Sequence, residues 1–122
     1  MAGVTVRMDD LNRLVATLTD KTNGMDSRSS LIVRKAALDV EAYAKQYVPV
    51  DTGFLKNSIH AVIRTNSWRV YAAEVIAEAF YANFVESGTS RMSPQPFMGP
   101  ALDRVMPGFV AAMESIANPL RP

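Results

Sequence analysis

The sequence predicts an α+β fold in which a long helix and terminal helices pack on a small antiparallel sheet. Three observations support this class. A helical apolar period runs through residues 27–47, and a second runs through residues 101–116. Between them, two alternating segments at about residues 57–76 predict a hairpin. With 122 residues, of which 48% are hydrophobic, the chain is expected to form a single domain, residues 1–122, around one core.

The N-terminal part is predicted to hold a strand or arm, then a first helix. Residues 1–8 alternate weakly, so they form either a short strand or a flexible arm. Residues 11–18 are predicted to be helical, and Asp9 and Asp10 before them suit the positive end of a helix dipole. The apolar residues at helical spacing here are Leu11, Leu14, Val15 and Leu18. Residues 20–30 contain Asn-Gly and three serines, and are expected to be a loop.

The strongest helical pattern lies between Ser27 and Tyr47. Its apolar stripe consists of Ile32, Ala36, Val40, Tyr43 and Tyr47, widened by Val33, Ala37, Ala44 and Val48. The helix is expected to stop at Val48, because Pro49 disfavours helical geometry in the residue before it. The opposite, polar side of this helix carries basic residues: Arg34, Lys35 and Lys45.

The segment VPVDTGFL, residues 48–55, is predicted to turn the chain from this helix towards the sheet. Asp51 or Thr52 can accept backbone N–H bonds in such a turn. Gly53 supplies a backbone angle that other residues resist. Phe54 and Leu55 are then expected to re-enter the core.

The tripeptide Asp51-Thr52-Gly53 also occurs in aspartic proteases, so a homodimeric protease that uses Asp51 as its catalytic acid is an alternative. Such an enzyme needs a second carboxylate beside the first. It also places the tripeptide in a β-rich fold with a glycine-rich flap. Here a helical segment and a proline precede the tripeptide, so the turn is the preferred interpretation.

The hairpin is formed by residues 58–64 and 68–76, with Thr65-Asn66-Ser67 as its turn. Trp68, near the hairpin tip, is either an interface anchor or a core residue. Residues 80–85 predict a short helix that ends near Gly88, a suitable C-cap.

The C-terminal part begins with a proline-rich segment and continues as a helix. Residues 91–100 contain three prolines and are expected to be mainly extended. The helix of residues 101–116 follows, and Pro107-Gly108 is expected to bend it or split it in two. Residues 117–122 are expected to be a tail.

Composition narrows the function further. The chain has no cysteine and one histidine, so it offers no thiolate metal site and no multi-histidine site within one copy, and no cofactor is predicted. Thirteen basic and 12 acidic residues give a net charge of +1, which does not favour a strong nucleic-acid binder. Because the N-terminus lacks a long apolar run, no signal peptide, membrane span or membrane partner is expected.

Three segments in this order resemble a known family: A-x-x-Y-V-P-V-D-T-G-x-L-x-x-S-I at residues 44–59, Y-A-x-F-V-E-x-G-T at 81–89, and P-Q-P-F-M-x-P-A at 94–101. They resemble the neck and tail-completion (head–tail connector) proteins of long-tailed bacteriophages, the HK-ninety-seven-type gene-product-ten family. The resemblance covers roughly residues 30–105.

The resemblance implies a non-enzymatic structural protein of the virion, located at the head–tail junction and in the host cytoplasm during assembly. It implies a ring, most often of six subunits although a dodecamer is also considered, around the channel for genomic double-stranded DNA. The DNA would pass without sequence-specific contact. The implied partners are other copies, head–tail connector proteins, and tail tube or terminator proteins. A tail terminator and a DNA-packaging accessory protein are the alternatives within the virus.

The resemblance also marks candidate site residues. The structural turn comprises Pro49, Asp51, Thr52, Gly53 and Leu55. The candidate inter-subunit contacts are Tyr81, Glu86, Gly88, Thr89, Arg91, Pro96, Phe97 and Met98. The charged side of the long helix, rather than a family motif, supplies the candidate channel-facing basic residues, Arg34, Lys35 and Lys45, which otherwise form a solvated face.

Two of these assignments have alternatives. Glu86 either caps or pairs locally, for example with Arg91, or pairs with a basic residue of a neighbouring subunit. Phe97 and Met98 either cover the chain's own core or belong to a stiff, exposed proline-rich segment that docks on another protein.

Overall fold

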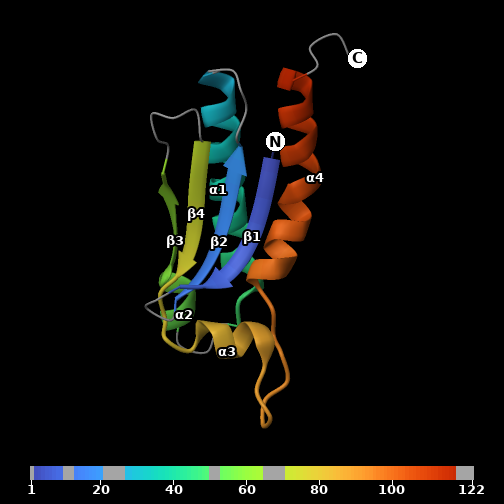
Figure 1. Ribbon diagram of the computed structural model, residues 1–122. Helices are drawn as coiled ribbons and strands as arrows, with labels where there is room; N and C mark the ends of the chain where they lie inside the picture. Colours follow the sequence, from blue (N-terminus) through green and yellow to red (C-terminus); the bar gives the residue numbers. More distant parts are fainter. Residues whose placement is uncertain (1, 10–12, 21–26, 50–52, 65–70, 118–122) are drawn as a thin grey trace.

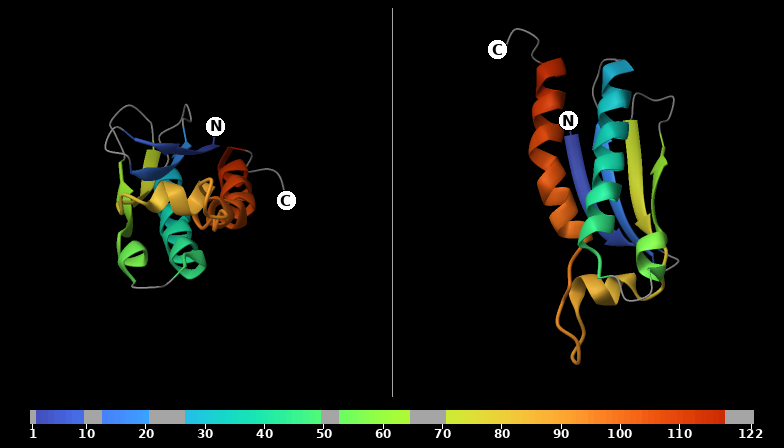
Figure 2. Two further views of the ribbon diagram at one scale, coloured as in Figure 1. Left: turned by 90° about the horizontal axis from the view of Figure 1, so that it is seen from below. Right: turned by 180° about the vertical axis from the view of Figure 1, so that it is seen from behind.

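The computed structural model describes residues 2–9, 13–20, 27–49, 53–64 and 71–117. A four-stranded antiparallel sheet forms one layer, and two long helices lie side by side against one of its faces (Figures 1 and 2). The strands are β1 (Ala2–Met8), β2 (Leu14–Asp20), β3 (Ile59–Ile63) and β4 (Tyr71–Ala77), in the order β1-β2-β4-β3. The helices are α1 (Ser27–Tyr47), α2 (Phe54–Asn57), α3 (Ala82–Ser87) and α4 (Met98–Ala117).

The predicted α+β class and the predicted hairpin are confirmed. β3 pairs with β4 in a register that runs from Ile59 opposite Ala77 to Ile63 opposite Ala73. Of the two alternatives for residues 1–8, the strand is right, because β1 pairs with β2 along its whole length. The sheet is therefore larger than the hairpin that the sequence predicted. Trp68 lies outside the described residues.

The predicted helix over residues 11–18 is wrong, because this part of the chain forms the central strand β2. Its buried residues face both sides of the sheet. Leu14 and Leu18 join the main core under the helices, whereas Val15 is buried on the other face, where it pairs with Ile76 of β4. Burial on both faces produces spacings of three and four residues in a strand, and these imitate a helix.

Asp9 also differs from its predicted role at the start of a helix. Its backbone N–H donates to the carbonyl oxygen of Arg13 at 2.9 Å, and its carboxylate accepts the backbone N–H of Arg13 at 2.9 Å and the guanidinium at 2.8 Å. Asp9 therefore closes the turn between β1 and β2. The Asp9 carboxylate, as the strongest partner, raises the pKa of Arg13.

The long helix α1 is confirmed with the predicted bounds, and it ends at Tyr47, two residues before Pro49. Its predicted stripe faces the sheet and α4. The buried members of the stripe are Val33, Ala36, Ala37, Val40, Ala44 and Val48, and Ile32, Tyr43 and Tyr47 are partly buried beside them. α1 is therefore the element around which the core is built.

α4 starts at Met98, before the predicted position Ala101, and it continues through Pro107 as one helix. Of the two predicted effects of Pro107-Gly108, splitting of the helix is therefore wrong. α4 is joined to α1 by Arg104, whose guanidinium lies 4.3 Å from the ring centre of Tyr43 and donates a 3.0 Å hydrogen bond to the hydroxyl of Tyr47. This contact is a cation–π interaction supported by a hydrogen bond.

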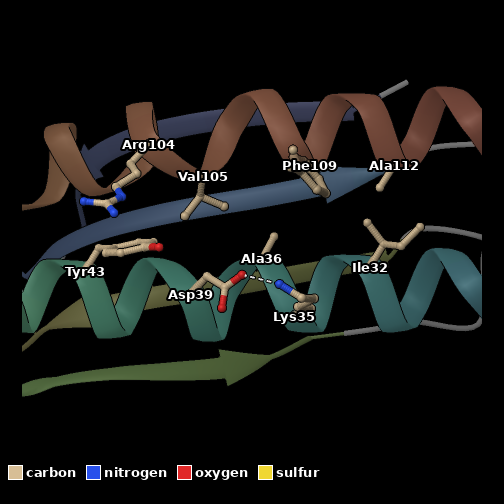
Figure 3. A pocket seen from close by; sticks show the side chains of 10 residues that line it. Ile32, Lys35, Ala36, Asp39, Tyr43, Arg104, Val105, Phe109 and Ala112 are labelled. Atoms are coloured by element: carbon tan, nitrogen blue, oxygen red, sulfur yellow. Dashed lines mark hydrogen bonds and ion pairs between the residues drawn. The ribbon is translucent and has the colours of Figure 1, made fainter.

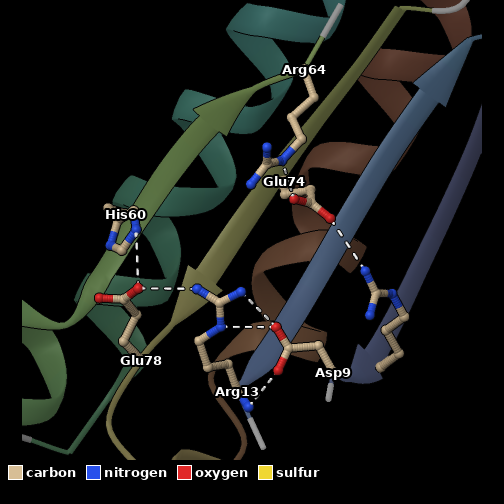
Figure 4. Close-up of polar contacts among 7 residues, drawn as sticks. Asp9, Arg13, His60, Arg64, Glu74 and Glu78 are labelled. Carbon is tan, nitrogen blue, oxygen red and sulfur yellow. Dashed lines mark hydrogen bonds and ion pairs between the residues drawn. The ribbon is translucent and has the colours of Figure 1, made fainter. Parts of the chain in front are cut away.

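The face of the sheet opposite the helices carries a polar network (Figure 4). Glu74 of β4 binds Arg64 at 2.6 Å and Arg7 of β1 at 3.3 Å. Arg7 lies opposite Val15 in the pairing register and His60 lies opposite Ile76, so long polar side chains flank the two buried apolar residues of this face. Their aliphatic stems can shield Val15 and Ile76 while the charged ends remain in water.

Burial predicts that two phenylalanines differ strongly in their contribution to the free energy of unfolding. Phe97 is completely buried, whereas Phe84 is 52% exposed. Phe97→Ala should lower the free energy of unfolding by about 3–5 kcal/mol, because it removes buried surface and leaves a cavity. Phe84→Ala should change it by about 0.5 kcal/mol or less. Urea unfolding of both variants measures the difference, and equal losses would contradict the assignment of Phe97 to the core.

Candidate functional site

Three segments that are far apart in the sequence meet at one end of the molecule, below the sheet in Figure 1. They are the turn that leads from α1 into α2, helix α3 with the residues before it, and the loop of residues 88–97 that leads to α4. We call this region, residues 48–49, 53–58 and 79–99, the motif end. It contains a hollow of about 330 Å³ lined by Pro49, Gly53, Leu55, Tyr81, Val85, Met92 and Gln95. The motif segments identified in the sequence thus form one site.

Gly53 is the residue before α2, its N-cap. Its backbone is in the left-handed region, with a φ angle of 78°. Only glycine adopts this angle without strain, so the predicted use of Gly53 in a turn is confirmed. Leu55 is buried, as predicted, but Phe54 is 60% exposed, so the prediction that both residues re-enter the core is wrong for Phe54. Asp51 and Thr52 lie outside the described residues.

Ser58 ties this turn to the segment before α3. Its hydroxyl donates to the carbonyl oxygen of Leu55 at 2.7 Å and accepts the backbone N–H of Ala79 at 3.1 Å. Its carbonyl oxygen accepts the backbone N–H of Glu78 at 3.2 Å. The end of β4 is therefore held against α2.

Glu86 of α3 caps the N-terminus of α4. One carboxylate oxygen accepts the backbone N–H groups of Phe97 at 3.0 Å and Met98 at 2.8 Å, and the other accepts that of Gly99 at 3.0 Å. The first N–H groups of a helix have no partner within the helix, and a negative charge there interacts favourably with the helix dipole. Of the alternatives for Glu86, the structure shows the local cap.

The loop of residues 88–97 is fixed to α3 by its backbone. Gly88 ends α3 with a φ angle of 76°, and its N–H donates to the carbonyl oxygen of Phe84 at 2.7 Å. A Cβ atom on Gly88 would lie 2.8 Å from the backbone nitrogen of Pro94 and 2.9 Å from the carbonyl oxygen of Met92, so only glycine fits. The N–H of Gln95 donates to the carbonyl oxygen of Val85 at 2.8 Å.

The tip of this loop is closed by two hydrogen bonds between Thr89 and Met92, at 2.8 and 3.3 Å. The N–H of Arg91 donates to the Thr89 hydroxyl at 3.2 Å. In Figure 1 the loop projects beyond α3 at the lower end of the molecule. The loop is therefore an ordered projection, and its residues 89–96 are exposed.

The candidate inter-subunit residues divide into three groups, of which the first, Tyr81, Glu86 and Gly88, is partly buried. Phe97 and Met98 are completely buried, so the prediction that the proline-rich segment exposes them is wrong, and they cover the chain's own core as the alternative proposed. Thr89, Arg91 and Pro96 are exposed. Within the described residues no ion pair joins Arg91 to Glu86.

The motif end also carries exposed aromatic side chains that the sequence did not single out. Phe80 is 77% exposed, and Phe54 and Phe84 are also exposed. The partly buried ring of Tyr81 stacks on Phe54 with centroids 6.2 Å apart and meets Phe80 edge-on at 5.2 Å. Phe84 lies on the exposed side of the short helix α3, and Phe80 lies in the turn before that helix.

The basic residues proposed to face a channel lie on α1. Lys35 binds Asp39 at 2.7 Å beside a groove of about 300 Å³ between α1 and α4, and this hydrogen bond raises the pKa of Lys35 (Figure 3). Lys45 lies 3.6 Å from Glu41. Arg34 is exposed and has no ion-pair partner within the described residues. The structure thus neutralises two of these three cations locally.

The described parts of the chain contain few side chains that are arranged for catalysis or metal binding. His60 lies on the open sheet face, 3.8 Å from Glu78. Among these residues no group of histidine, aspartate and glutamate has the arrangement to hold a metal ion. None of the described helices is both long and apolar enough to cross a bilayer.

Removal of the Glu86 cap should destabilise the protein measurably. Glu86→Ala leaves three partly buried N–H groups without an acceptor, so we expect a loss of about 1–3 kcal/mol in the free energy of unfolding. Glu86→Gln, which keeps one acceptor oxygen, should lose less. Amide hydrogen exchange at Phe97, Met98 and Gly99 should accelerate in Glu86→Ala and remain slow in the control Glu114→Ala. Unchanged exchange rates would contradict the capping role.

Two glycines should respond in opposite directions to alanine. Gly88→Ala strains a left-handed residue and collides with the backbone of the loop, so it should destabilise the protein by about 1–3 kcal/mol. A Cβ atom on Gly108, within α4, meets nothing within 4 Å. Gly108→Ala should therefore stabilise the helix by about 0.5–1 kcal/mol. Thermal unfolding of both variants tests this, and the same sign for both would refute it.

Comparison with known proteins identifies one family. The family described as "Bacteriophage HK97-gp10, putative tail-component" matches residues 9–88, which include β2, α1, the hairpin, α3, the first motif segment and all but the last residue of the second. No curated protein and no solved structure matches the chain. Because the match covers more than half of the 122 residues, the chain belongs to the HK97 gp10-like family of bacteriophage tail components.

Proposed function

We propose that this protein is a non-enzymatic structural subunit of the phage head–tail junction, where it forms a ring around the DNA channel and helps to join the tail to the head. Membership of a tail-component family supports a role in the virion. The observation that carries the finer proposal is the motif end, where three segments build an ordered projection beside exposed aromatic rings. This end of the subunit is the surface that docks on the adjoining protein of the virion.

The physical case for docking rests on what the motif end exposes. Phe54, Phe80 and Phe84 together expose several hundred Å² of apolar surface, because each phenylalanine can bury about 150–250 Å². Patches of this size mark interaction sites on soluble proteins, and aromatic side chains are enriched among residues that dominate binding. The loop is already held in place by Gly88 and by the carbonyl oxygen of Val85, so binding orders less of the chain.

The charge distribution fits a subunit through which DNA slides. Lys35 and Lys45 are paired within α1, and the arginines of the open sheet face are paired with glutamates. A strongly cationic lining would retain phosphate groups by a salt-dependent attraction. The same feature argues against a DNA-packaging accessory protein as the alternative. A tail terminator, a ring protein of similar size, is the nearer alternative.

The double variant Phe80→Ser/Phe84→Ser tests this proposal in a phage that lacks the gene. The variant should fold, because both side chains are exposed, but it should fail to restore infectivity. Electron microscopy of the lysate should show filled heads and separate tails. Ile63→Ser, which changes an equally apolar but distant residue of β3 that is 42% exposed, is the matched control and should complement.

Full complementation by the double variant would refute docking through the motif end. Absence of the protein from purified wild-type virions would refute the structural role itself.

A further inference from the structure

The two long helices present unlike faces to solvent. The α1 outer face comprises Leu31, Leu38 and Ala42 with the basic residues Arg34 and Lys45. The α4 outer face comprises Met106 and Val110 with the acidic residues Asp103 and Glu114. Over its whole length α1 has four basic and two acidic residues, a balance of +2. α4 has one basic and two acidic residues, a balance of −1.

The α1 outer face is apolar at its centre. Leu31 is 64% exposed and Leu38 is 46% exposed. They are seven residues apart, so they lie on the same side of the helix about 10 Å from each other. Arg34 lies between them along the helix and is unpaired within the described residues. Two exposed leucines beside a free cation form a surface that favours an apolar, acidic partner.

The α4 outer face has those properties. Met106 is 41% exposed and Val110 is partly exposed. Asp103 and Glu114 are exposed and have no ion-pair partner in the described part of the chain. The one basic residue of this helix, Arg104, points to the other side, where Tyr43 and Tyr47 hold it (Figure 3).

The two faces lie on opposite sides of the helical layer. On α1, Ile32 and Tyr43 line the groove towards α4, whereas the Glu41 carboxylate accepts the backbone N–H of Ala61 in β3, on the other flank. On α4, Val105 and Phe109 line the same groove. The outer faces therefore cannot meet within one chain. A contact between them joins two copies head to tail, the geometry that closes rings.

We propose that the α1 outer face of one subunit packs against the α4 outer face of the next, and that this contact closes the ring. The inference rests on the proposed function, because it assumes that the chain assembles with itself. A second copy is the occupant that the charges favour: Arg34 meets Asp103 and Glu114, and the leucines meet Met106 and Val110. Pairing α1 with α1 would instead bring Arg34 of two copies together, which disfavours that contact.

The absence of natural cysteines makes this contact directly measurable. We would place one thiol on each face in the same chain, with Leu38→Cys and Met106→Cys, at positions that are exposed in the subunit. A short thiol-to-thiol crosslinker should then convert assembled protein into a ladder of covalent oligomers that ends at the ring size. Each single-cysteine variant should remain monomeric on a denaturing gel. The matched control, Leu38→Cys/Thr5→Cys, moves the second thiol to the open sheet face and should give no ladder.

A charge exchange provides the second measurement. Arg34→Glu makes the α1 outer face less basic, and Asp103→Arg makes the α4 outer face less acidic, so each variant alone should need about tenfold more protein to assemble. An equimolar mixture should recover assembly, because each variant then supplies the complement that the other lacks. Light scattering after size exclusion, over a concentration series at low ionic strength, gives the assembled mass.

Each outcome separates the inference from the function on which it rests. If the wild-type protein assembles but the Leu38→Cys/Met106→Cys chain gives no ladder, the ring stands and the contact is wrong. Dimers of Leu38→Cys alone would show that α1 pairs with itself, which also overturns the contact. If Arg34→Glu loses DNA binding but assembles normally, the α1 outer face lines the channel and the proposed contact is wrong. A wild-type chain that never self-associates, alone or on particles, would refute the ring.

Discussion

The carboxylate of Glu86 is the constraint on which the motif end of the molecule depends. It binds three backbone N–H groups at the start of α4, eleven to thirteen residues further along the chain. This one side chain therefore fixes α3, the base of the projecting loop and the first turn of α4 relative to one another. Burial of Phe97 and Met98 directly beside the cap anchors the same junction in the core.

The Glu86 cap also helps to explain why the loop of residues 88–97 is ordered although its composition is typical of flexible loops. The segment from Gly88 to Pro96 contains glycine, serines and prolines, a composition typical of flexible loops. Its C-terminal end is held against α3, because the carbonyl oxygen of Val85 accepts the N–H of Gln95 and Glu86 accepts that of Phe97. Gly88 then permits a backbone approach that any side chain would block. The order of the loop arises from backbone contacts, so its side chains remain available to a partner.

The sequence predicted the elements whose pattern comes from one buried face. α1 presents a single stripe to the sheet and α4, and the hairpin strands alternate, so both were predicted at nearly their observed bounds. β2 was mistaken for a helix because Val15 is buried on one face of the sheet and Leu14 and Leu18 on the other. Its β-branched residues Val15, Thr17 and Thr19 were the signal for a strand.

The candidate site was predictable in part for a similar reason. Gly53 and Gly88 need special backbone angles, and local sequence reveals such needs. The partner of Glu86 lies in another segment, and the buried side of a helix as short as α3 is decided by the surrounding fold. Sequence reasoning could therefore place Phe54, Phe80 and Tyr81 near a turn and a short helix, but it could not show that the first two face solvent.

The distribution of paired charges connects the fold to assembly. On the open sheet face, Arg7 and Arg64 share Glu74, so this face offers little net charge to a partner. The described charged residues whose side chains have neither an ion pair nor a hydrogen bond within the described parts of the chain lie elsewhere: Arg34, Lys56, Arg91, Asp103 and Glu114. Lys56 and Arg91 belong to the motif end, and the other three belong to the outer faces of α1 and α4. Because unpaired charges steer association most strongly, the proposed contacts fall where these charges lie, on the two helical flanks and at one end.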